Sequence, residues 1–210
     1  MKRNTKEEIL IESLRLFAQS GYNGVTMRDI AGSVGIRQSS LYKHFAGKQE
    51  IFESIVERMD AEYKAKLDKM RLASGNDSVQ RAEQYAKKTL TAIADIGEAL
   101  FKYWTQDEYA SLFRKMLIVE QYRNPKLAAL YQKYFLSGVI KFQEEIISSL
   151  IGKGFFKKGN PELLAMEFQG PIFLMITAYD TAENKTAFVE LVREHVKNFG
   201  RQHAICVEEV

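Results

Sequence analysis

Hydrophobic residues recur along most of the chain at intervals of three and four, the spacing that places them on one face of an α-helix. Strict alternation of apolar and polar residues, which would indicate β-strands, is scarce. We therefore predict an all-α protein. Helices are expected over residues 5–20, 48–72, 78–96, 98–104, 107–122, 125–151, 161–181 and 184–200, with a turn at Ser74–Asp77 and two further short helices after the first one.

The two short helices after residue 20 are joined by a glycine turn. The hydroxyl of Thr26 is suited to cap the first of them, and Asp29 stands where a capping carboxylate would. Gly35 is expected to end that helix in the left-handed conformation. The next helix carries Leu41 and Phe45 on one face, one helical turn apart.

The opposite face of the second short helix is polar. A helix, a glycine turn and a polar-faced helix form the helix-turn-helix plan, whose second helix enters the major groove of DNA. Residues near the start of that helix contact base edges. Gln38 and Ser39 occupy these positions, and Gln can form a bidentate bond with adenine.

The N-terminal segment, over roughly residues 5–55, resembles the DNA-binding domain of the TetR family of bacterial regulators. The resemblance implies a three-helix DNA-binding domain over residues 1–47. It also implies a helical effector-binding and dimerisation domain over residues 48–210, entered through a connecting helix at 48–72. The matching elements are Ile9-Leu10, Phe17-Ala18, Gly21-Tyr22, Val25-Thr26, Asp29-Ile30-Ala31, Gly35-Ile36, Leu41-Tyr42, His44-Phe45 and Lys48.

The expected DNA contacts fall into two groups. Base edges are assigned to Gln38, Ser39, Ser40 and Arg37, and phosphates to Thr26, Tyr42, His44 and Lys48, with Arg28 and Lys43 as further backbone contacts. The phosphate assignments are what the resemblance implies. The alternative interpretation is that Tyr42 and His44 only pack the motif together. Arg37 departs from the Ser-like cap that family members often have, and either leaves the helix less well capped or adds a phosphate or guanine contact.

Charge is distributed unevenly along the chain. Residues 1–50 hold eight basic and five acidic side chains, whereas residues 51–210 hold 22 of each. The whole excess of three positive charges therefore lies at the expected DNA-binding end, where Lys and Arg can neutralise phosphates.

The last two predicted helices are candidates for a dimer interface. The helix over 161–181 is apolar nearly all round, so it must be buried on more than one side, and Gly170-Pro171 is expected to kink it. The pair is similar to the helices through which TetR-family subunits form a four-helix bundle. The alternative is that both helices complete the core of one chain. The interface residues predicted are Phe168, Phe173, Ile176, Phe188, Leu191, Val192, His195 and Phe199.

Aromatic residues are dense between Phe101 and Phe142. For any one of them, core packing is the simpler interpretation. The family, whose members usually bind a small molecule among these helices, implies that some of them line a pocket for a lipophilic or aromatic effector. The candidate ligand-binding residues are Tyr85, Phe101, Trp104, Phe113, Met116, Tyr134 and Phe142.

Motifs for catalysis, metals and cofactors are missing from the sequence. There is no H-E-x-x-H segment, no Glu-x-x-His pair and no glycine-rich phosphate loop, and Cys206 is the only cysteine. We expect neither an enzyme nor a cofactor. Because no apolar leader and no run of about 18 apolar residues is present, we expect a cytoplasmic protein without membrane contact.

Together these patterns predict a homodimeric transcriptional regulator, most simply a repressor of a palindromic operator. A small-molecule effector would bind the C-terminal domain and move the helix at 48–72. An architectural or adaptor protein, controlled by a protein partner, is the alternative. A sizeable closed cavity among the helices at 78–96, 107–122 and 125–151 would favour the sensor, and a filled core beside an exposed apolar groove would favour the adaptor.

Overall fold

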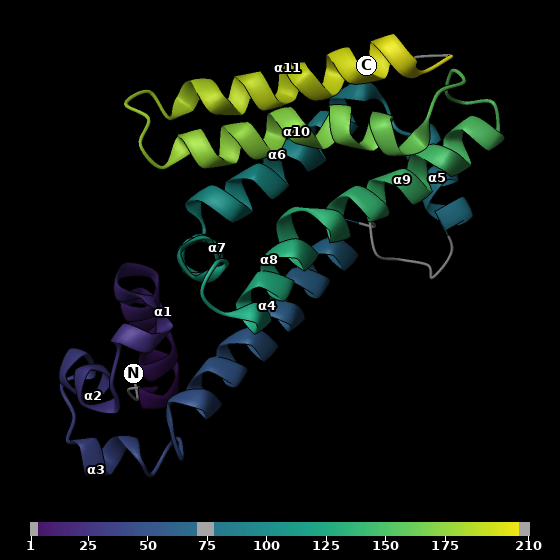
Figure 1. The fold of residues 1–210 in the computed structure, drawn as a ribbon. Coiled ribbons are helices and arrows are strands. Elements are labelled where there is room, and N and C mark those ends of the chain that lie inside the picture. Colours follow the sequence, from purple (N-terminus) through teal and green to yellow (C-terminus); the bar gives the residue numbers. More distant parts are fainter. Residues whose placement is uncertain (1–3, 71–77, 206–210) are drawn as a thin grey trace. The chain divides into compact units, whose positions relative to one another are not determined.

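The computed structural model describes residues 4–70 and 78–205 and is helical, as predicted (Figure 1). The turn expected at Ser74–Asp77, and Cys206, lie outside the described residues. Within them, the only β pairing is an isolated bridge between Phe156 and Ala204. The helices are α1 (Thr5–Gly24), α2 (Met27–Val34), α3 (Gln38–Leu41), α4 (Lys48–Lys69), α5 (Ser78–Ala86), α6 (Leu90–Gln106), α7 (Glu108–Glu120), α8 (Pro125–Phe135), α9 (Ser137–Gly152), α10 (Pro161–Tyr179) and α11 (Thr186–His203).

The chain forms two compact units. Unit 1 combines Met1–Lys66 with Glu108–Tyr131, and unit 2 combines Leu67–Asp107 with Gln132–Val210. This division does not coincide with the domain boundary at residues 47 and 48 drawn from the sequence, because α7 packs along α1 and so joins the N-terminal unit. Sequence motifs mark where an element begins, whereas compact units follow packing between segments distant in the chain.

Unit 1 is built around the first three helices. The apolar stripe of α1 is buried as expected, α2 packs on α1, and α3 packs on α2. The buried side chains include Ile9, Leu14, Phe17, Ile30, Leu41 and Phe45. Leu41 and Phe45 therefore face inward, which leaves the other side of α3 to solvent.

A buried carboxylate joins α7 to the end of α1. Glu120 is almost completely buried, and its Oε1 accepts a hydrogen bond of 3.1 Å from the backbone N–H of Tyr22. Gly21 has a φ of 74°, and a Cβ atom at this position would clash with the same oxygen. The glycine is therefore required both by its conformation and by the close approach of Glu120.

Unit 2 is a layered helical bundle in which α6 packs on α11, α9 on α10, and α5 on α9. Figure 1 shows α10 and α11 running side by side in opposite directions. Contact between α6 and α11 is close at Gly97, where an added Cβ would lie 3.0 Å from Cγ2 of Val196. Gly97 thus lets two helices approach each other.

This role corrects the helix boundary predicted at residue 97, between the expected helices at 78–96 and 98–104. The expected helices at 78–96 and 98–104 are wrong in their boundary, because the interruption lies at residues 87–89. There Thr89 caps α6, its hydroxyl accepting a hydrogen bond of 3.2 Å from the N–H of Ala92. A glycine inside a helix can serve packing as readily as it ends a helix.

The single helix expected over 125–151 is also wrong, since it divides into α8 and α9 at Leu136. Leu136 has φ −123° and ψ −107°, outside the helical region. Gly138 lies two residues further along, and a Cβ atom there would clash with the carbonyl oxygen of Lys133. The chain turns so tightly at this point that only glycine fits without rearrangement.

Helix starts that carry local signals were predicted correctly. Asn124 caps α8 ahead of Pro125, and its Oδ1 accepts a hydrogen bond of 3.0 Å from the N–H of Lys126. Asn160 caps α10 in the same way and accepts from Glu162 and Leu163 at 3.0 and 3.2 Å. α10 continues through Pro171 to Tyr179.

The contact at Gly97 yields a test of stability. Replacing it by leucine (Gly97→Leu) forces a side chain between α6 and Val196, and overpacking of this kind costs about 1–3 kcal/mol. We expect the free energy of unfolding, measured by urea denaturation followed by circular dichroism, to fall by that amount.

Gly32→Ala is the matched control, because Gly32 is exposed in α2 with open space around it. That control should leave stability unchanged or raise it by up to about 1 kcal/mol. Equal stability of Gly97→Leu and the parent would contradict the packing role.

Candidate functional site

The first helix of the helix-turn-helix is fixed at both ends. Thr26 and Asp29 form a capping box: the Thr26 hydroxyl accepts from the Asp29 N–H at 3.2 Å, and Asp29 accepts from the Thr26 N–H at 2.8 Å. The hydroxyl of Thr26 also donates to the carboxylate of Asp29, and these bonds lower the pKa of Asp29. Gly35 ends α2 with a φ of 72°, as predicted, and the turn leads directly into α3.

The outer face of α3 presents polar side chains to solvent. Gln38, Ser39, Tyr42 and Lys43 are exposed, and Ser40 is half-buried. Tyr42 keeps 49% of its surface exposed, so it is not a packing residue of the motif. The backbone bonds Tyr42 N–H to Gln38 and Phe45 N–H to Leu41 extend the helical geometry beyond the four residues of α3 itself. The predicted base-reading residues therefore share one accessible face.

Arg37 precedes α3 as its N-cap residue, and its side chain makes no capping hydrogen bond. Of the two interpretations left open by the sequence, the less well capped helix agrees with this geometry. The exposed guanidinium remains available for a phosphate or a base.

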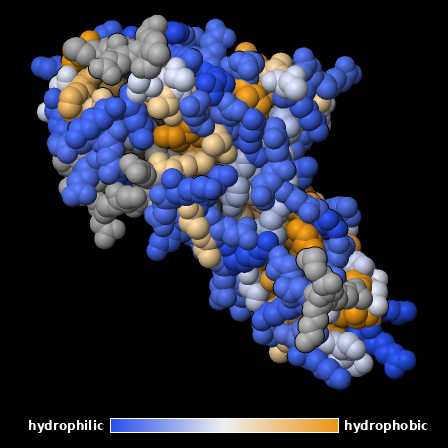
Figure 2. Space-filling model, turned by 180° about the vertical axis from the view of Figure 1, so that it is seen from behind, coloured by the Kyte–Doolittle hydropathy of each residue, from blue (hydrophilic) through white to orange (hydrophobic). Residues whose placement is uncertain are grey.

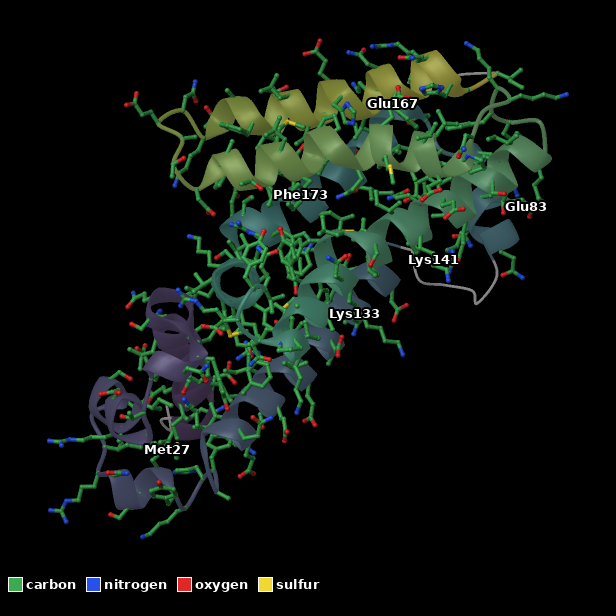
Figure 3. The ribbon with its side chains drawn as sticks, in the orientation of Figure 1. Met27, Glu83, Lys133, Lys141, Glu167 and Phe173 are labelled. Carbon is green, nitrogen blue, oxygen red and sulfur yellow. The ribbon has the colours of Figure 1, made fainter. Side chains whose placement is uncertain are left out.

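The remaining backbone candidates differ in how available they are. Arg28 and His44 are exposed. Thr26 is exposed too, but its hydroxyl is engaged with Asp29. Met27, labelled in Figure 3 at the start of α2, is buried and anchors this end of the helix.

Lys48 has an internal role. Its Nζ donates to the carbonyl oxygens of Tyr22 and Val25 at 2.7 and 2.8 Å and lies 4.4 Å from the centre of the Tyr22 ring. Burial lowers the pKa of Lys48, and the charge of Glu120 opposes this shift. Lys48 therefore stabilises the connection between α1 and α2. This geometry does not support the phosphate contact that the resemblance implied for Lys48.

A cavity of about 720 Å³ lies within unit 2. It is lined by residues of α5, α6, α9, α10 and α11 and by the segment that follows α9. Of the candidate ligand-binding residues, only Tyr85 lines it. Of the three segments named from the sequence, those at 78–96 and 125–151 line the cavity, whereas no residue of α7 does, and α10 and α11 complete the lining.

The other candidate ligand-binding residues lie in packed regions. Phe113 and Met116 are fully buried in unit 1, and Phe142 packs near Arg81 in unit 2. Trp104 forms an aromatic cluster, its ring centre 5.8 Å from that of Tyr134. Phe101 packs edge-on against Tyr179. The aromatic density of this region is therefore largely core packing.

The predicted dimer-interface residues divide between the inside and the surface of unit 2. Ile176, Val192 and Phe199 are buried inside the unit. Phe168, Phe173 and Phe188 are half-buried, as is His195, whose Nε2 lies 2.8 Å from the carbonyl oxygen of Phe168. Only Leu191 is exposed among the residues predicted.

An apolar surface nevertheless remains on this helix pair. Leu163 and Leu174 on α10 are 62% and 68% exposed, and Met166 and Leu191 are exposed as well. Phe173, labelled on α10 in Figure 3, marks the helix that carries most of them. We call Leu163, Met166, Leu174 and Leu191 the α10–α11 apolar face. The other side of α10, which carries Ile172 and Ile176, is packed inside unit 2.

Sequence reasoning missed Glu120 and most of the cavity lining. Glu120 ends a helix like any surface acid, and only its burial reveals its role. Phe168 and Phe199 were assigned to an interface, but both line the cavity. Two features of the sequence mark this region: the helix interruption at residues 87–89 and the glycines that follow α9.

Within residues 4–70 and 78–205, none of the helices has the length and hydrophobicity that a bilayer span requires. The same described residues contain no group of His, Cys, Asp and Glu arranged to hold a metal ion.

Comparison with known proteins places the N-terminal segment in a family. Residues 9–55 match the family model for bacterial regulatory proteins of the tetR family. A relative is the biofilm operon icaADBC HTH-type negative transcriptional regulator IcaR of Staphylococcus aureus, 28% identical over 151 residues, which cover 70% of this chain and 77% of IcaR.

Solved structures share the fold over nearly the whole chain. A TetR-family regulator from Mesorhizobium loti superposes with a TM-score of 0.64 at 17% identity, over 96% of this chain and 97% of that one. A transcriptional regulator from Saccharomonospora viridis, solved in complex with choline, gives a TM-score of 0.61 at 21% identity, over 92% and 94%. The helix-turn-helix geometry, the family match over residues 9–55 and this shared fold together identify the chain as a member of the TetR family of transcriptional regulators.

Proposed function

We propose that the protein is a homodimeric repressor that binds a pseudo-palindromic operator and is released from it by a small-molecule effector. The observation that carries the DNA-binding part is the exposed polar face of α3 opposite the buried Leu41 and Phe45. Similarity to IcaR, a negative regulator, supports repression.

In this proposal the start of α3 reads bases in the major groove. Gln38 and Ser39 contact base edges, with Ser40 and Arg37 beside them. Tyr42, Lys43, His44 and Arg28 contact the phosphate backbone, which sets the register of the helix without reading sequence. Two such helices in a dimer would contact successive major grooves, separated by roughly 34 Å or somewhat more.

The α10–α11 apolar face is the surface that we assign to dimerisation. These leucines are exposed on a helix that is already packed on its other side. Covering them with a second copy of the chain would bury apolar surface and so stabilise a dimer. Phe173 and Phe188, half-buried near this face, would complete the contact.

An effector in unit 2 is the expected release signal. The cavity of about 720 Å³ has a size typical of ligand sites. The S. viridis neighbour holds a small molecule, choline, which supports a ligand-responsive function. A difference of about 1–3 kcal/mol in operator affinity between free and effector-bound protein would suffice for a switch. The adaptor alternative requires a filled core beside its apolar groove and is less well supported, because unit 2 holds a cavity.

Operator recognition is tested by selecting bound duplexes from a randomised pool and sequencing them. We expect an enriched palindrome. Gln38→Ala should relax the preference at one position of each half-site, at a cost of about 1–3 kcal/mol for the selected operator. Tyr42→Ala should instead weaken binding to all sequences alike.

Gln132→Ala is the control for these variants, because Gln132 is exposed on α8, outside the helix-turn-helix. It should bind the selected operator like the parent protein. Weak, salt-sensitive binding without any enriched sequence would contradict the proposal.

Dimerisation is tested with a charge on the α10–α11 apolar face. Leu174→Glu places a carboxylate where we expect an apolar contact, and should convert the dimer to a monomer in analytical ultracentrifugation. Leu174→Met keeps the size and apolar character of the side chain and should remain dimeric. A Leu174→Glu protein that stays dimeric at the same concentration would show that another surface forms the interface.

A further inference from the structure

The unit 2 cavity lies where α5, α6, α9, α10 and α11 meet the segment that follows α9, and it is partly open to solvent. Backbone bonds fix its outer wall: the N–H of Lys157 donates to the carbonyl of His203 at 2.8 Å, and that of Ile205 to Phe155 at 2.9 Å. Because these bonds tie the segment after α9 to the end of α11, the wall is part of the fold rather than a loose loop.

The body of the cavity is apolar. Ile146, Ile147 and Leu150 of α9 line one side, and Phe168 and Phe199 line another, with ring centres 5.0 Å apart. Figure 2 shows apolar residues reaching the surface in patches surrounded by hydrophilic ones. A ligand for this space needs a hydrocarbon or aromatic body.

All charged side chains among the lining residues are positive. They are Lys87, Lys88 and Lys153, and no aspartate or glutamate lines the cavity. Lys153 forms an ion pair with Glu83, labelled on α5 in Figure 3. In the described part of the chain, Lys87 and Lys88 form no ion pair. Two positive charges without a carboxylate partner therefore line the apolar cavity.

These two lysines lie at the interruption between α5 and α6. The adjoining first residue of α6, Leu90, also lines the cavity, so the positive end of the α6 dipole lies at the same place. The lysines would repel a cationic ligand, and a neutral ligand would gain no charge–charge attraction from them. An anionic head group would be attracted by the lysines and by the helix end together.

We propose that this cavity binds an amphiphile with a single anionic head group, carboxylate or phosphate, held by Lys87 and Lys88 with its apolar body against α9, Phe168 and Phe199. The proposal rests on the proposed function, since it names the class of effector for that regulator. Lys153 is already paired and supports the site less directly.

Binding is tested by isothermal titration calorimetry on the full-length protein with four ligands of equal chain length: dodecanoate, dodecyl phosphate, dodecanol and dodecylamine, each below its aggregation concentration. We expect saturable binding of at least one anionic ligand, tighter than that of dodecanol by about tenfold or more. Comparing the two anions tells whether a carboxylate or a phosphate is preferred. Equal affinity for dodecanol or dodecylamine, or no binding of either anion, would overturn the proposal.

The double variant Lys87→Gln/Lys88→Gln isolates the head-group contact. It should lower the affinity for the anionic ligand by about tenfold or more and leave the affinity for dodecanol unchanged. Lys141→Gln is the matched control, because Lys141, labelled on α9 in Figure 3, is exposed and outside the lining. An unchanged affinity of the double variant for the anion would place the ligand elsewhere.

Operator binding, measured separately on the duplex selected above, distinguishes this inference from the proposed function. Selective operator binding without any binding of an anionic amphiphile overturns only the inference. Binding of the anion at Lys87 and Lys88 by a protein that selects no operator supports the site and overturns the repressor.

Discussion

The joint between α1 and α2 depends on a buried carboxylate. Glu120 of α7 reaches the backbone N–H of Tyr22, while Lys48 of α4 holds the carbonyls of Tyr22 and Val25. Helix ends leave backbone groups without partners, and a buried one that stays unpaired costs about 1–3 kcal/mol. Side chains from two other helices satisfy these groups, so the end of α1 and its connection to α2 are fixed by tertiary contacts. The orientation of the helix-turn-helix within unit 1 follows from this joint.

Local signals explain what the sequence predicted well. The capping box at Thr26 and Asp29, the left-handed Gly35, and the Asn–Pro starts of α8 and α10 each need only neighbouring residues, and each is present. The inward face of α3 was readable for the same reason, since Leu41 and Phe45 are one turn apart. The resemblance to the family rests on these same positions.

Other features depend on segments far apart in the chain. Gly97 packs against α11, and Gly138 approaches a carbonyl, so neither follows the rule that a glycine ends a helix. The aromatic residues near Trp104 proved to be core because α6 meets α8, which no spacing reveals. On α10 both sides are apolar, and periodicity could not distinguish the side packed inside from the exposed Leu163 and Leu174.

The short helix α3 has little stability of its own. α3 has four residues and no side-chain cap at Arg37, so Leu41 and Phe45 hold it in place. Gln38 and Ser39 contribute nothing to that anchoring. In the proposed operator complex, substitutions at these two positions would therefore change the preferred operator without a cost in folding. Duplicated copies of such a gene could thus diverge to new targets by single substitutions, while the scaffold beneath them stays the same.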